Sequence, residues 1–310
     1  MVVTLTMNPS IDTGASVDQV QPERKLRCGK PDFEPGGGGL NVARVLVRLG
    51  ASATACYPCG GSNGDLLNSL LADSDIDPRP VSIEGMTREN VTISENNSDR
   101  QFRFVMPGPQ LSQPEWDACL QVIRDLTDAT YIVASGSLPP GVPDDFYARV
   151  ASIGRHNGAR VIVDTSGEPL RLAVEEGVYL VKPNLRELGD ISGRPTDTDR
   201  DIHQAAGELC SRDKCEAMVV SLGSGGALLV NGDEIVQYRS PTVPIRSKVG
   251  AGDSMVGGII AGLTRDWPLD RAVRLGIAAG AAAVMTPGTE LCRRKDTERL
   301  FAELEEETHE

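Results

Sequence analysis

The chain has no excess of positive charge. Its 310 residues include 31 lysines and arginines but 44 aspartates and glutamates, so the net charge at pH 7 is −13 and the isoelectric point is near 4.8. Nucleic acids and anionic membrane surfaces attract proteins through a basic face. This balance excludes a nucleic-acid or membrane partner as the main ligand. Any phosphate that the protein binds must be met by local cations.

Long apolar runs are also missing. No segment approaches the roughly 18 consecutive apolar residues that span a membrane, and residues 1–9 lack the basic and apolar regions of a signal peptide. The seven cysteines are odd in number and scattered along the chain, which is not the pattern of a disulfide framework and suits free thiols in a reducing compartment. We therefore expect a cytoplasmic protein.

One pair of cysteines, Cys56 and Cys59, has the C-x-x-C spacing of a dithiol redox site. Such sites normally lie at a helix N-terminus, which lowers the pKa of the thiol. Here the pair follows an expected strand, and the glycine-rich residues 60–64 separate it from the next expected helix. We interpret both thiols as strand-end side chains. A dithiol oxidoreductase is kept as an alternative of another class.

The chain also lacks internal repeats and low-complexity linkers, and short apolar runs alternate with helical patterns along most of it. This alternation is typical of a parallel sheet covered by helices, an α/β fold. We expect strands at 2–6, 51–56, 131–135, 160–164, 179–181 and 218–222. We expect helices at 40–49, 66–72, 114–126, 144–156 and 201–210, others beginning at Asp253, Leu269 and Lys295, a hairpin at 226–238, and a frayed acidic helix end at 303–310.

Two segments break this alternation. Residues 12–33 show no clear helix period, and residues 90–106 have the pattern of a hairpin with its turn at 96–99. We expect them to form a small sheet outside the main one, where a lid over a cleft usually lies. The predicted organisation is a single domain, 1–310, with lid segments at about 12–33 and 88–106.

The most informative segment, residues 249–258, places two glycines and a carboxylate at the start of an expected apolar helix. A helix start exposes unpaired N–H groups and the positive end of the helix dipole, so it can hold phosphate. Gly250 and Gly252 would let this backbone approach closely. Asp253 would then take a proton from a hydroxyl that attacks the bound phosphoryl group. The alternative is that Asp253 only caps the helix.

A second glycine-rich segment, residues 36–39, leads directly into an expected helix with Asn41 in its first turn. Bare backbone lets a polyhydroxyl ligand lie close, and the Asn41 carboxamide offers both a donor and an acceptor. Asp12 could accept hydrogen bonds from sugar hydroxyls. The alternatives are a flexible loop for the glycines and an ordinary turn residue for Asp12.

A third segment delivers Lys182, Asn184 and Glu187 from a strand to a loop and a helix start. Lysine can neutralise phosphate oxygens, while Asn and Glu suit a hydrated Mg²⁺ held through water. The expected strand at 218–222 leads into glycines at 223–226, which would line a nucleotide pocket or form an ordinary hairpin. This turn lacks the Gly-Lys-Ser/Thr ending of a Walker A loop.

In their order and spacing these segments resemble the PfkB (ribokinase-like) family of carbohydrate kinases. The resemblance covers essentially the whole chain and is most specific at residues 33–39, 103–108, 135–141 and 249–257. It implies a ribokinase-like three-layer α/β sandwich with a mostly parallel central sheet and a small β-sheet lid. Within the family the chain is most similar to the phosphosugar branch, including at residues 22–28 and 288–292.

The resemblance implies a role for each segment. Asp253 would be the base, with an anion hole at Gly250, Ala251 and Gly252, which suits a transfer that depends on alignment and charge stabilisation. The sugar hydroxyls would be held by Asp12, Gly37, Gly38 and Asn41, with Ser137 near the sugar phosphate. The positive charge for that phosphate would come from Lys25, Arg27 and Arg88, whose alternative is a solvated lid surface.

The same resemblance places ATP and metal ions. Lys182 and Asn184 would handle the ATP phosphates, Glu187 would hold Mg²⁺ through water, and Ser221, Gly223 and Gly226 would contact the nucleotide. A possible K⁺ site near the anion hole, formed partly by carbonyls, would involve Ser247, Val249, Ala283, Thr286, Gly288 and Glu290. An arginine or another residue is expected where Glu290 stands, but a carbonyl ligand tolerates that change.

The implied activity is ATP-dependent phosphorylation of fructose 6-phosphate at its 1-hydroxyl, a glycolytic step, by a homodimer that pairs through the lid. A 1-phosphofructokinase or a tagatose-6-phosphate kinase needs the same cations and is kept as an alternative. A kinase of ribose or adenosine is less favoured, because a neutral acceptor has no need of Lys25, Arg27 and Arg88. A non-catalytic sugar-phosphate sensor fits poorly with an intact Gly-Ala-Gly-Asp.

Overall fold

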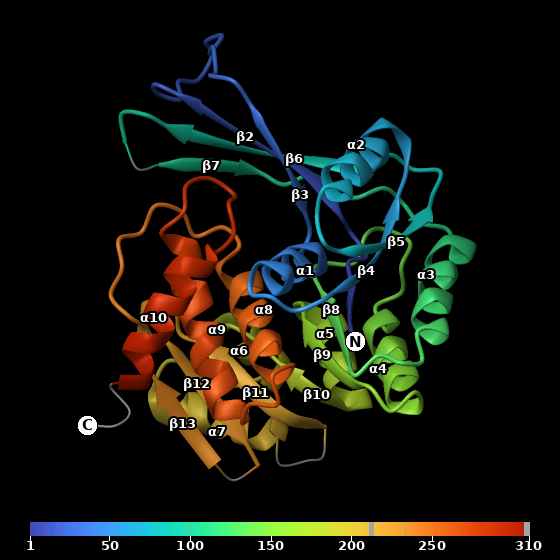
Figure 1. Cartoon of the computed structure of the whole chain (residues 1–310), viewed down its shortest axis with the longest axis vertical. Coiled ribbons are helices and arrows are strands. Elements are labelled where there is room, and N and C mark those ends of the chain that lie inside the picture. Colours follow the sequence, from blue (N-terminus) through green and yellow to red (C-terminus); the bar gives the residue numbers. More distant parts are fainter. Residues whose placement is uncertain (99, 211–213, 233, 307–310) are drawn as a thin grey trace.

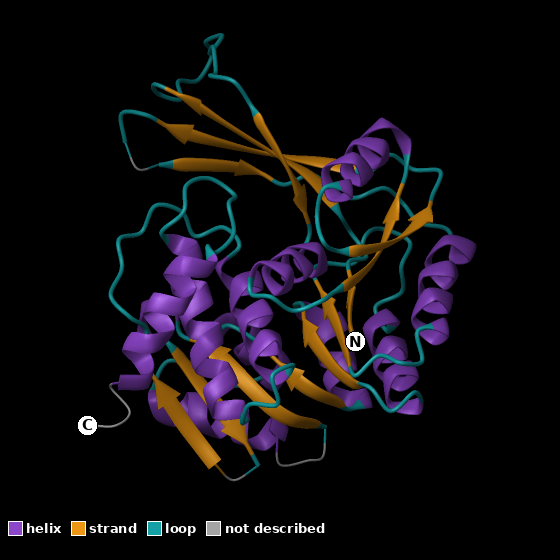
Figure 2. Ribbon diagram, viewed as in Figure 1, coloured by secondary structure: helices purple, strands orange, loops and turns teal. Residues whose placement is uncertain are grey.

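A sheet of nine strands forms the centre of the protein, and a separate sheet of four strands stands apart from it (Figures 1 and 2). The structure is a computed structural model that describes residues 1–98, 100–210, 214–232 and 234–306. The strand order in the large sheet is β13-β12-β11-β10-β9-β8-β1-β4-β5. Its strands are β1 (Val2–Leu5), β4 (Thr54–Cys59), β5 (Asp77–Ser82), β8 (Tyr131–Ser135), β9 (Arg160–Asp164), β10 (Val178–Val181), β11 (Cys215–Ser221), β12 (Ala227–Asn231) and β13 (Glu234–Tyr238).

The large sheet is parallel from β5 to β11, and only β12 and β13 pair antiparallel. Its central strands are buried on both faces, as β8 shows: Tyr131 and Val133 contact one core cluster, while Ile132 and Ala134 contact the other. Strands of this kind have continuous apolar sequences, because helices cover both sides. The predicted α/β sandwich is therefore confirmed.

Two layers of helices provide this cover (Figure 2). One core cluster joins the sheet to α1 (Gly38–Arg48), α2 (Gly61–Ala72), α8 (Ala251–Leu263), α9 (Leu269–Val284) and α10 (Arg294–Glu306). The other joins it to α3 (Gln113–Asp125), α4 (Phe146–His156), α5 (Gly167–Glu176), α6 (Leu185–Ser192) and α7 (Asp199–Cys210). The helices whose first turns carry the expected catalytic segments, α1 and α8, lie on the same face.

The small sheet has the order β3-β2-β6-β7 and lies at the top of Figure 1. It consists of β2 (Ser10–Val17), β3 (Asp32–Gly36), β6 (Arg88–Glu95) and β7 (Gln101–Phe104). The two segments that break the alternation thus come together, with β2 and β6 parallel and in register along eight residues of each strand. Of the expected hairpin turn at 96–99, residue 99 lies outside the described residues.

Several expected boundaries were wrong. Helix α2 begins at Gly61, because the glycines at 60–64 belong to its start and do not form a linker. Strand β4 runs to Cys59, three residues beyond its expected end. Strand β5 was missed because Pro78 and Pro80 hide its pattern, and prolines are tolerated at the edge of a sheet. The expected hairpin at 226–238 is present as β12 and β13, and the acidic tail is helical to Glu306, beyond which it lies outside the described residues.

The Cys56 and Cys59 thiols lie on opposite faces of β4. Cys56 belongs to the core cluster beneath α3, whereas Cys59 belongs to the other cluster and lies 3.7 Å from Asn68 Oδ1. Residues three apart on a strand point away from each other, so the pair cannot form a disulfide without breaking the strand. A hydrogen bond with Cys119, together with burial, raises the pKa of Cys56, and burial raises the pKa of Cys59. The interpretation as structural side chains stands, although α2 begins only two residues after Cys59, closer than expected.

Within the described ranges, no helix has both the length and the apolar character needed to cross a bilayer.

Candidate active site

A cavity of about 220 Å³ opens at the carboxyl ends of the central strands. Ligands of parallel α/β sheets bind at this edge, where the loops after the strands meet. Side chains and backbone from β8, β9, α6 and α8 converge here. The lining residues are Ser135, Gly136, Ser137, Asp164, Thr165, Ser166, Glu187 and Asp253.

The start of helix α8 has the geometry of an anion hole. Gly250 is its N-cap residue with a left-handed φ of 71°, and a Cβ there would lie 2.6 Å from Leu291 Cδ2. Only glycine fits this position without strain. The N–H groups of the first turn, including those of Ala251 and Gly252, have no carbonyl partner within the helix. They are therefore available to a phosphoryl group.

Asp253 stands in that first turn, half-buried beside the cavity. Desolvation and the nearby Asp164 carboxylate raise its pKa to about 6, while a 2.8 Å hydrogen bond from Asn41 Nδ2 and the charge of Lys182 act in the opposite direction. A carboxylate with a pKa close to neutrality is suited to accept a proton during a reaction. The N-cap of α8 is Gly250, three residues before Asp253, and the Asp253 carboxylate instead accepts from Asn41 across to α1.

Lys182 lies beside the anion hole and is buried. Its Nζ atom is 3.2 Å from Asp164 Oδ1, and a Cβ added at Gly252 would lie 3.6 Å from that Nζ. Asp164 is the last residue of β9, and Lys182 directly follows β10. These two strands are adjacent and parallel, so their carboxyl ends bring the two side chains together. Sequence reasoning missed Asp164. A carboxylate at the carboxyl end of an expected strand was the available signal.

Asn184 and Glu187 cap helix α6. The Asn184 side chain accepts from Glu187 N at 2.9 Å, and Glu187 Oε2 accepts from Asn184 N at 2.8 Å, which forms a capping box. Glu187 also lines the cavity, where burial raises its pKa. No group of three or more histidine, cysteine or acidic side chains converges anywhere in the described part of the chain. A metal here would take few ligands from the protein.

The expected nucleotide residues lie at the end of β11. Ser221 N donates to Pro183 O at 2.9 Å, so this strand end is joined to the Lys182 loop. Gly223 has open space around it, as a nucleotide contact would need. Packing alone requires a glycine at position 226, because a Cβ there would lie 2.0 Å from Tyr238 O in the following hairpin.

The glycines at 36–39 pack tightly and do not form a flexible loop. A Cβ added at Gly37 would lie 2.6 Å from Thr6 Cγ2, and one at Gly38 would lie 2.3 Å from Ser135 Oγ. The small sheet supplies Asp12 nearby, whose Oδ1 accepts from Asn90 Nδ2 at 2.9 Å. Asp12 is close enough to Asp253 to raise the pKa of that carboxyl group.

Two of the expected phosphate ligands come together through Asn8. Its side-chain Nδ2 atom donates to Ser137 Oγ at 3.2 Å, and its backbone carbonyl oxygen accepts from Arg88 Nη2 at 2.8 Å. Arg88 Nη1 also donates to Met106 O at 3.0 Å. These contacts hold the Arg88 guanidinium between β6 and the loop after β1. Sequence reasoning gave no role to Asn8.

Lys25 and Arg27 do not reach this site. Both are exposed in the loop 18–31 between β2 and β3, which extends to the tip of the small sheet in Figure 1. Within the described residues neither side chain has a hydrogen-bond or ion-pair partner. Their distance from the cavity follows from the length and direction of the β2–β3 connection, which the sequence alone did not define.

The expected K⁺ residues meet beside the anion hole. Ser247 Oγ donates to Gly288 O at 2.6 Å and accepts from Val249 N at 3.2 Å. Thr286 Oγ1 donates to Ala283 O at 2.7 Å and also contacts Glu290 O. The Glu290 carboxylate pairs with Arg293 at 2.7 Å, while its backbone carbonyl accepts from Thr286.

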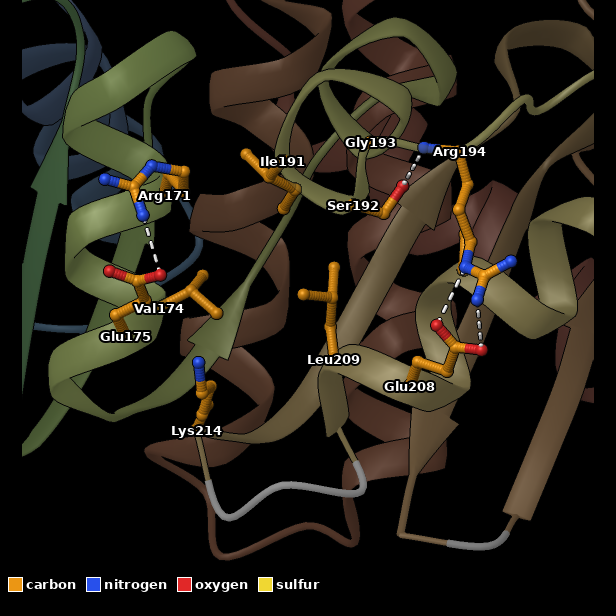
Figure 3. Close-up of a pocket in the computed structure, with 11 residues that line it drawn as sticks. Arg171, Val174, Glu175, Ile191, Ser192, Gly193, Arg194, Glu208, Leu209 and Lys214 are labelled. Carbon is orange, nitrogen blue, oxygen red and sulfur yellow. Dashed lines mark hydrogen bonds and ion pairs between the residues drawn. The ribbon is translucent and has the colours of Figure 1, made fainter.

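A larger cavity, about 450 Å³, lies between α5, α6 and α7 at their C-terminal ends (Figure 3). Because these helices run antiparallel to the strands, it is at the opposite edge of the sheet from Asp253. Its arginines are neutralised, since Arg171 pairs with Glu175 at 2.6 Å and Arg194 with Glu208 at 2.8 Å (Figure 3). This cavity lacks the anion hole and half-buried carboxylate that the smaller cavity has.

Comparisons with known proteins agree with this geometry. A family model described as pfkB family carbohydrate kinase matches residues 1–296. The chain is 47% identical to a Mycobacterium tuberculosis protein named ATP-dependent 6-phosphofructokinase isozyme 2, over 97% of this chain and 88% of that protein. It is 31% identical to a 1-phosphofructokinase of Bacillus subtilis, over 94% and 95% of the two chains.

The fold likewise matches solved structures of phosphofructokinase-2 from Escherichia coli. The complex with potassium gives a TM-score of 0.94 at 42% identity, and the complex with fructose-6-phosphate gives 0.93 at 41% identity. Each alignment covers 98% of this chain and 99% of the other. A third structure of that protein is its tetrameric inhibited form.

Proposed function

Because the chain belongs to the pfkB family of carbohydrate kinases, we propose that it transfers the γ-phosphoryl group of ATP to the 1-hydroxyl group of fructose 6-phosphate. The observation that carries this proposal is the half-buried Asp253, with its pKa raised to about 6, in the first turn of α8. A base and an anion hole in one turn are the two parts that phosphoryl transfer needs most.

In the proposed reaction, the 1-hydroxyl oxygen attacks the γ-phosphorus in line while Asp253 accepts the hydroxyl proton. The bond from the γ-phosphorus to its bridging oxygen breaks, and the electron pair leaves with ADP. The N–H groups at Gly250, Ala251 and Gly252, together with Lys182, stabilise the negative charge that spreads over the transferring group. The products are fructose 1,6-bisphosphate and ADP.

Mg²⁺ bound to the ATP phosphates would neutralise part of that charge. Glu187 lines the cavity with Asp164 and Asp253, but no three such side chains of the described residues converge as a ligand group, so Glu187 suits an ion that keeps most of its waters. Lys182 and Asn184 would act on the phosphates, with Ser221, Gly223 and Gly226 along the nucleotide.

For the sugar, we propose that Asp12, Gly37, Gly38 and Asn41 hold its hydroxyls, with Arg88 and Ser137 on its 6-phosphate. The contacts of Asn8 with both Ser137 and Arg88 support a shared phosphate pocket. Fructose 6-phosphate is favoured over fructose 1-phosphate because the relative named for the first activity is 47% identical and the one named for the second is 31% identical.

We further propose a homodimer that pairs through the small sheet. Phe33 and Phe104 stand in one row across this sheet, through Thr13 and Val91, and are 45% and 50% exposed. Val105, directly after β7, is 60% exposed. Exposed apolar groups that lie together mark an interaction surface. In such a dimer, Lys25 and Arg27 of one chain would complete the sugar-phosphate site of the other. A tetrameric form of the E. coli relative is consistent with assembly in this family.

K⁺ is proposed to bind where Ser247, Val249, Ala283, Thr286, Gly288 and Glu290 meet. Carbonyl and hydroxyl oxygens are the donors that such a cation takes, and the potassium complex of the E. coli relative supports the assignment. A cytoplasmic location would keep the seven free thiols reduced.

A coupled ADP-release assay tests the proposal, with fructose 6-phosphate, fructose 1-phosphate, tagatose 6-phosphate, ribose and adenosine compared at equal enzyme, with and without K⁺. We expect the highest kcat/KM with fructose 6-phosphate. A preference for another sugar phosphate would reassign the substrate. Tight binding of sugar phosphates without any turnover would instead indicate a sensor.

A further inference from the structure

The Asn41 carboxamide is held from both sides. Its Nδ2 atom donates to Asp253 Oδ2 at 2.8 Å, and its Oδ1 atom lies 3.4 Å from Arg44 Nη1, one turn further along α1. Arg44 is in turn anchored by the chain that enters this helix: Nη1 donates to Pro35 O at 2.9 Å, and Nη2 is 3.3 Å from Glu34 Oε2. A continuous set of contacts therefore joins the small sheet to the proposed base.

We propose that Arg44 is a positioning residue for phosphoryl transfer, which fixes the Asn41 carboxamide so that its NH₂ group faces Asp253, and that Glu34 of the small sheet holds Arg44 in place. The inference rests on the proposed function, because it concerns the base of that reaction. Arg44 itself touches neither the cavity nor Asp253.

The orientation of the Asn41 carboxamide decides which form of Asp253 is stabilised. An N–H donor facing the carboxyl group stabilises its ionised form, which is the form that accepts a proton. A carboxamide turned by half a rotation would present its oxygen, which stabilises the protonated acid instead. Arg44 selects the first orientation, because a guanidinium can only donate and must face the carboxamide oxygen.

Among the other charges around Asp253, Asp12 also acts on the Arg44 guanidinium. Asp164 at the end of β9 and Asp12 of β2 raise the Asp253 pKa, and Lys182 after β10 lowers it. Glu187 of α6 lines the same cavity. The Asn41 contact is the route to Asp253 that Arg44 reaches through a hydrogen bond.

Glu34 is the residue that keeps the Arg44 guanidinium where it is. Burial lowers the pKa of Arg44, while Glu34 and Asp12 oppose that effect and Arg48 adds to it. Thr289 Oγ1 lies 3.4 Å from the same Glu34 oxygen, so the loop beside the expected K⁺ residues also contacts this pair. Because Glu34 belongs to β3, a movement of the small sheet would shift Arg44 and, through it, the Asn41 carboxamide.

A purely structural role for Arg44 predicts a different result. Arg44 could serve only to tie β3 to α1 through Pro35 and Glu34, and its loss would then lower kcat/KM equally at every pH. The positioning role predicts a loss that depends on pH. Arg48 offers a matched control on the same helix, because it also ties down backbone carbonyls, those of Leu291 and Cys292 at 2.8 and 3.1 Å, without reaching Asn41.

The test compares Arg44→Met and Arg48→Met with the unaltered protein, by kcat/KM for fructose 6-phosphate against pH from 5.5 to 8.5, with thermal unfolding of each. If Arg44→Met raises the pKa of the base by about one unit, the ionised fraction falls about fivefold at pH 6 and hardly at all at pH 8. We expect this pattern for Arg44→Met, with calorimetric affinity for fructose 6-phosphate at pH 8 close to that of the unaltered protein. Arg48→Met should leave the acid limb, the decline of activity at low pH, at the pH of the unaltered protein.

A second variant decides the matter if Arg44→Met does not fold. Glu34→Gln keeps an acceptor for Arg44 but removes the charge, and should shift the acid limb in the same direction by less. An acid limb at its normal pH in this variant and in any folded Arg44→Met overturns the inference. No turnover of fructose 6-phosphate by the unaltered protein would contradict the proposed function. Normal turnover with unshifted pH profiles in the variants would contradict only the role of Arg44.

Discussion

Lys182 and Asp164 form an ion pair of 3.2 Å at the carboxyl ends of two adjacent parallel strands. The side chains are only 7% and 14% exposed, and they act in opposite directions on Asp253: the carboxylate raises its pKa and the ammonium lowers it. The pair therefore adjusts the pKa of Asp253 and leaves an ammonium beside the first turn of α8.

The first prediction concerns this ion pair. Removing one partner of a buried pair leaves an uncompensated charge and costs about 3–5 kcal/mol, so Lys182→Met should strongly lower the free energy of unfolding and raise KM for ATP. Adding Asp164→Asn should recover part of the stability but none of the ATP affinity. Urea unfolding and steady-state kinetics measure both. Arg299→Met, in an exposed pair with Glu303, is the control and should cost less than about 1 kcal/mol.

Asp253→Asn tests the base directly. The substitution keeps the size of the side chain but removes the proton acceptor, so kcat should fall about 10²- to 10⁴-fold while calorimetric binding of fructose 6-phosphate persists. Asp128→Asn, an exposed aspartate at the opposite edge of the sheet, should leave kcat unchanged. A near-normal kcat in Asp253→Asn would remove its assigned role.

The pH dependence follows from the raised pKa of Asp253. Its carboxylate is protonated as pH falls through about 6, so we expect kcat/KM to decline on the acid side near that pH. For stability the sign is the reverse. The folded protein holds this proton more tightly than the unfolded chain, so the stability that Asp253 contributes is present below pH 3.8 and lost as pH rises through about 6.

Thermal unfolding checks this sign. Asp253→Asn has no charge to desolvate, so its Tm should exceed that of the unaltered protein at pH 8, and the difference should shrink toward pH 5. A Tm difference that does not change with pH would show that desolvation of this carboxylate is not the cause.

Two helical glycines should respond in opposite ways to the same substitution. A Cβ at Gly258 of α8 would lie 2.8 Å from Gly276 Cα of α9, so Gly258→Ala should cost about 1–3 kcal/mol through overpacking. Gly207 of α7 has nothing within 4 Å of such a Cβ, so Gly207→Ala should add about 0.5–1 kcal/mol through helix propensity. Chemical denaturation of both variants measures the contrast. Similar destabilisation in both would mean that helix contact is not the cause.

Mixed dimers test whether the lid cations act across subunits. Asp253→Asn and the double variant Lys25→Ala, Arg27→Ala should each be weak alone at low sugar-phosphate concentration. If the cations serve the partner's site, subunit exchange in an equal mixture rebuilds one intact site in each mixed dimer and restores about a quarter of normal activity. Activity no higher than the average of the two variants would place these cations in their own chain's site or outside any site.

The sequence was most informative where the contributing residues are contiguous. The turn at Gly250 to Asp253 could be interpreted because its backbone geometry and its carboxylate lie within four residues. Asp164 could not be found in this way, because a single aspartate after an apolar strand has no pattern, and its partner Lys182 is distant in sequence. The alternation of strands and helices predicted the sandwich, whereas the prolines of β5 and the glycines of α2 concealed local structure that tertiary contacts stabilise.

The positions of Lys25 and Arg27 could not be predicted from the sequence. Their charge was evident, but where a long connection points depends on the pairing of four strands from separate parts of the chain. The same is true of Asn8, whose importance appears only when Ser137 and Arg88 are placed on either side of it.

The close approach of Gly38 to Ser135 has a consequence for how such an enzyme acquires new substrates. A side chain at position 38 would collide with the neighbouring strand end whatever sugar is bound. This glycine is therefore required by the fold and does not indicate which substrate the protein prefers. The connection at 18–31, exposed at the tip of the small sheet, is free of that restriction. If this loop completes the site of a partner subunit, as proposed, divergence toward another phosphorylated acceptor would begin there while the glycines stay unchanged.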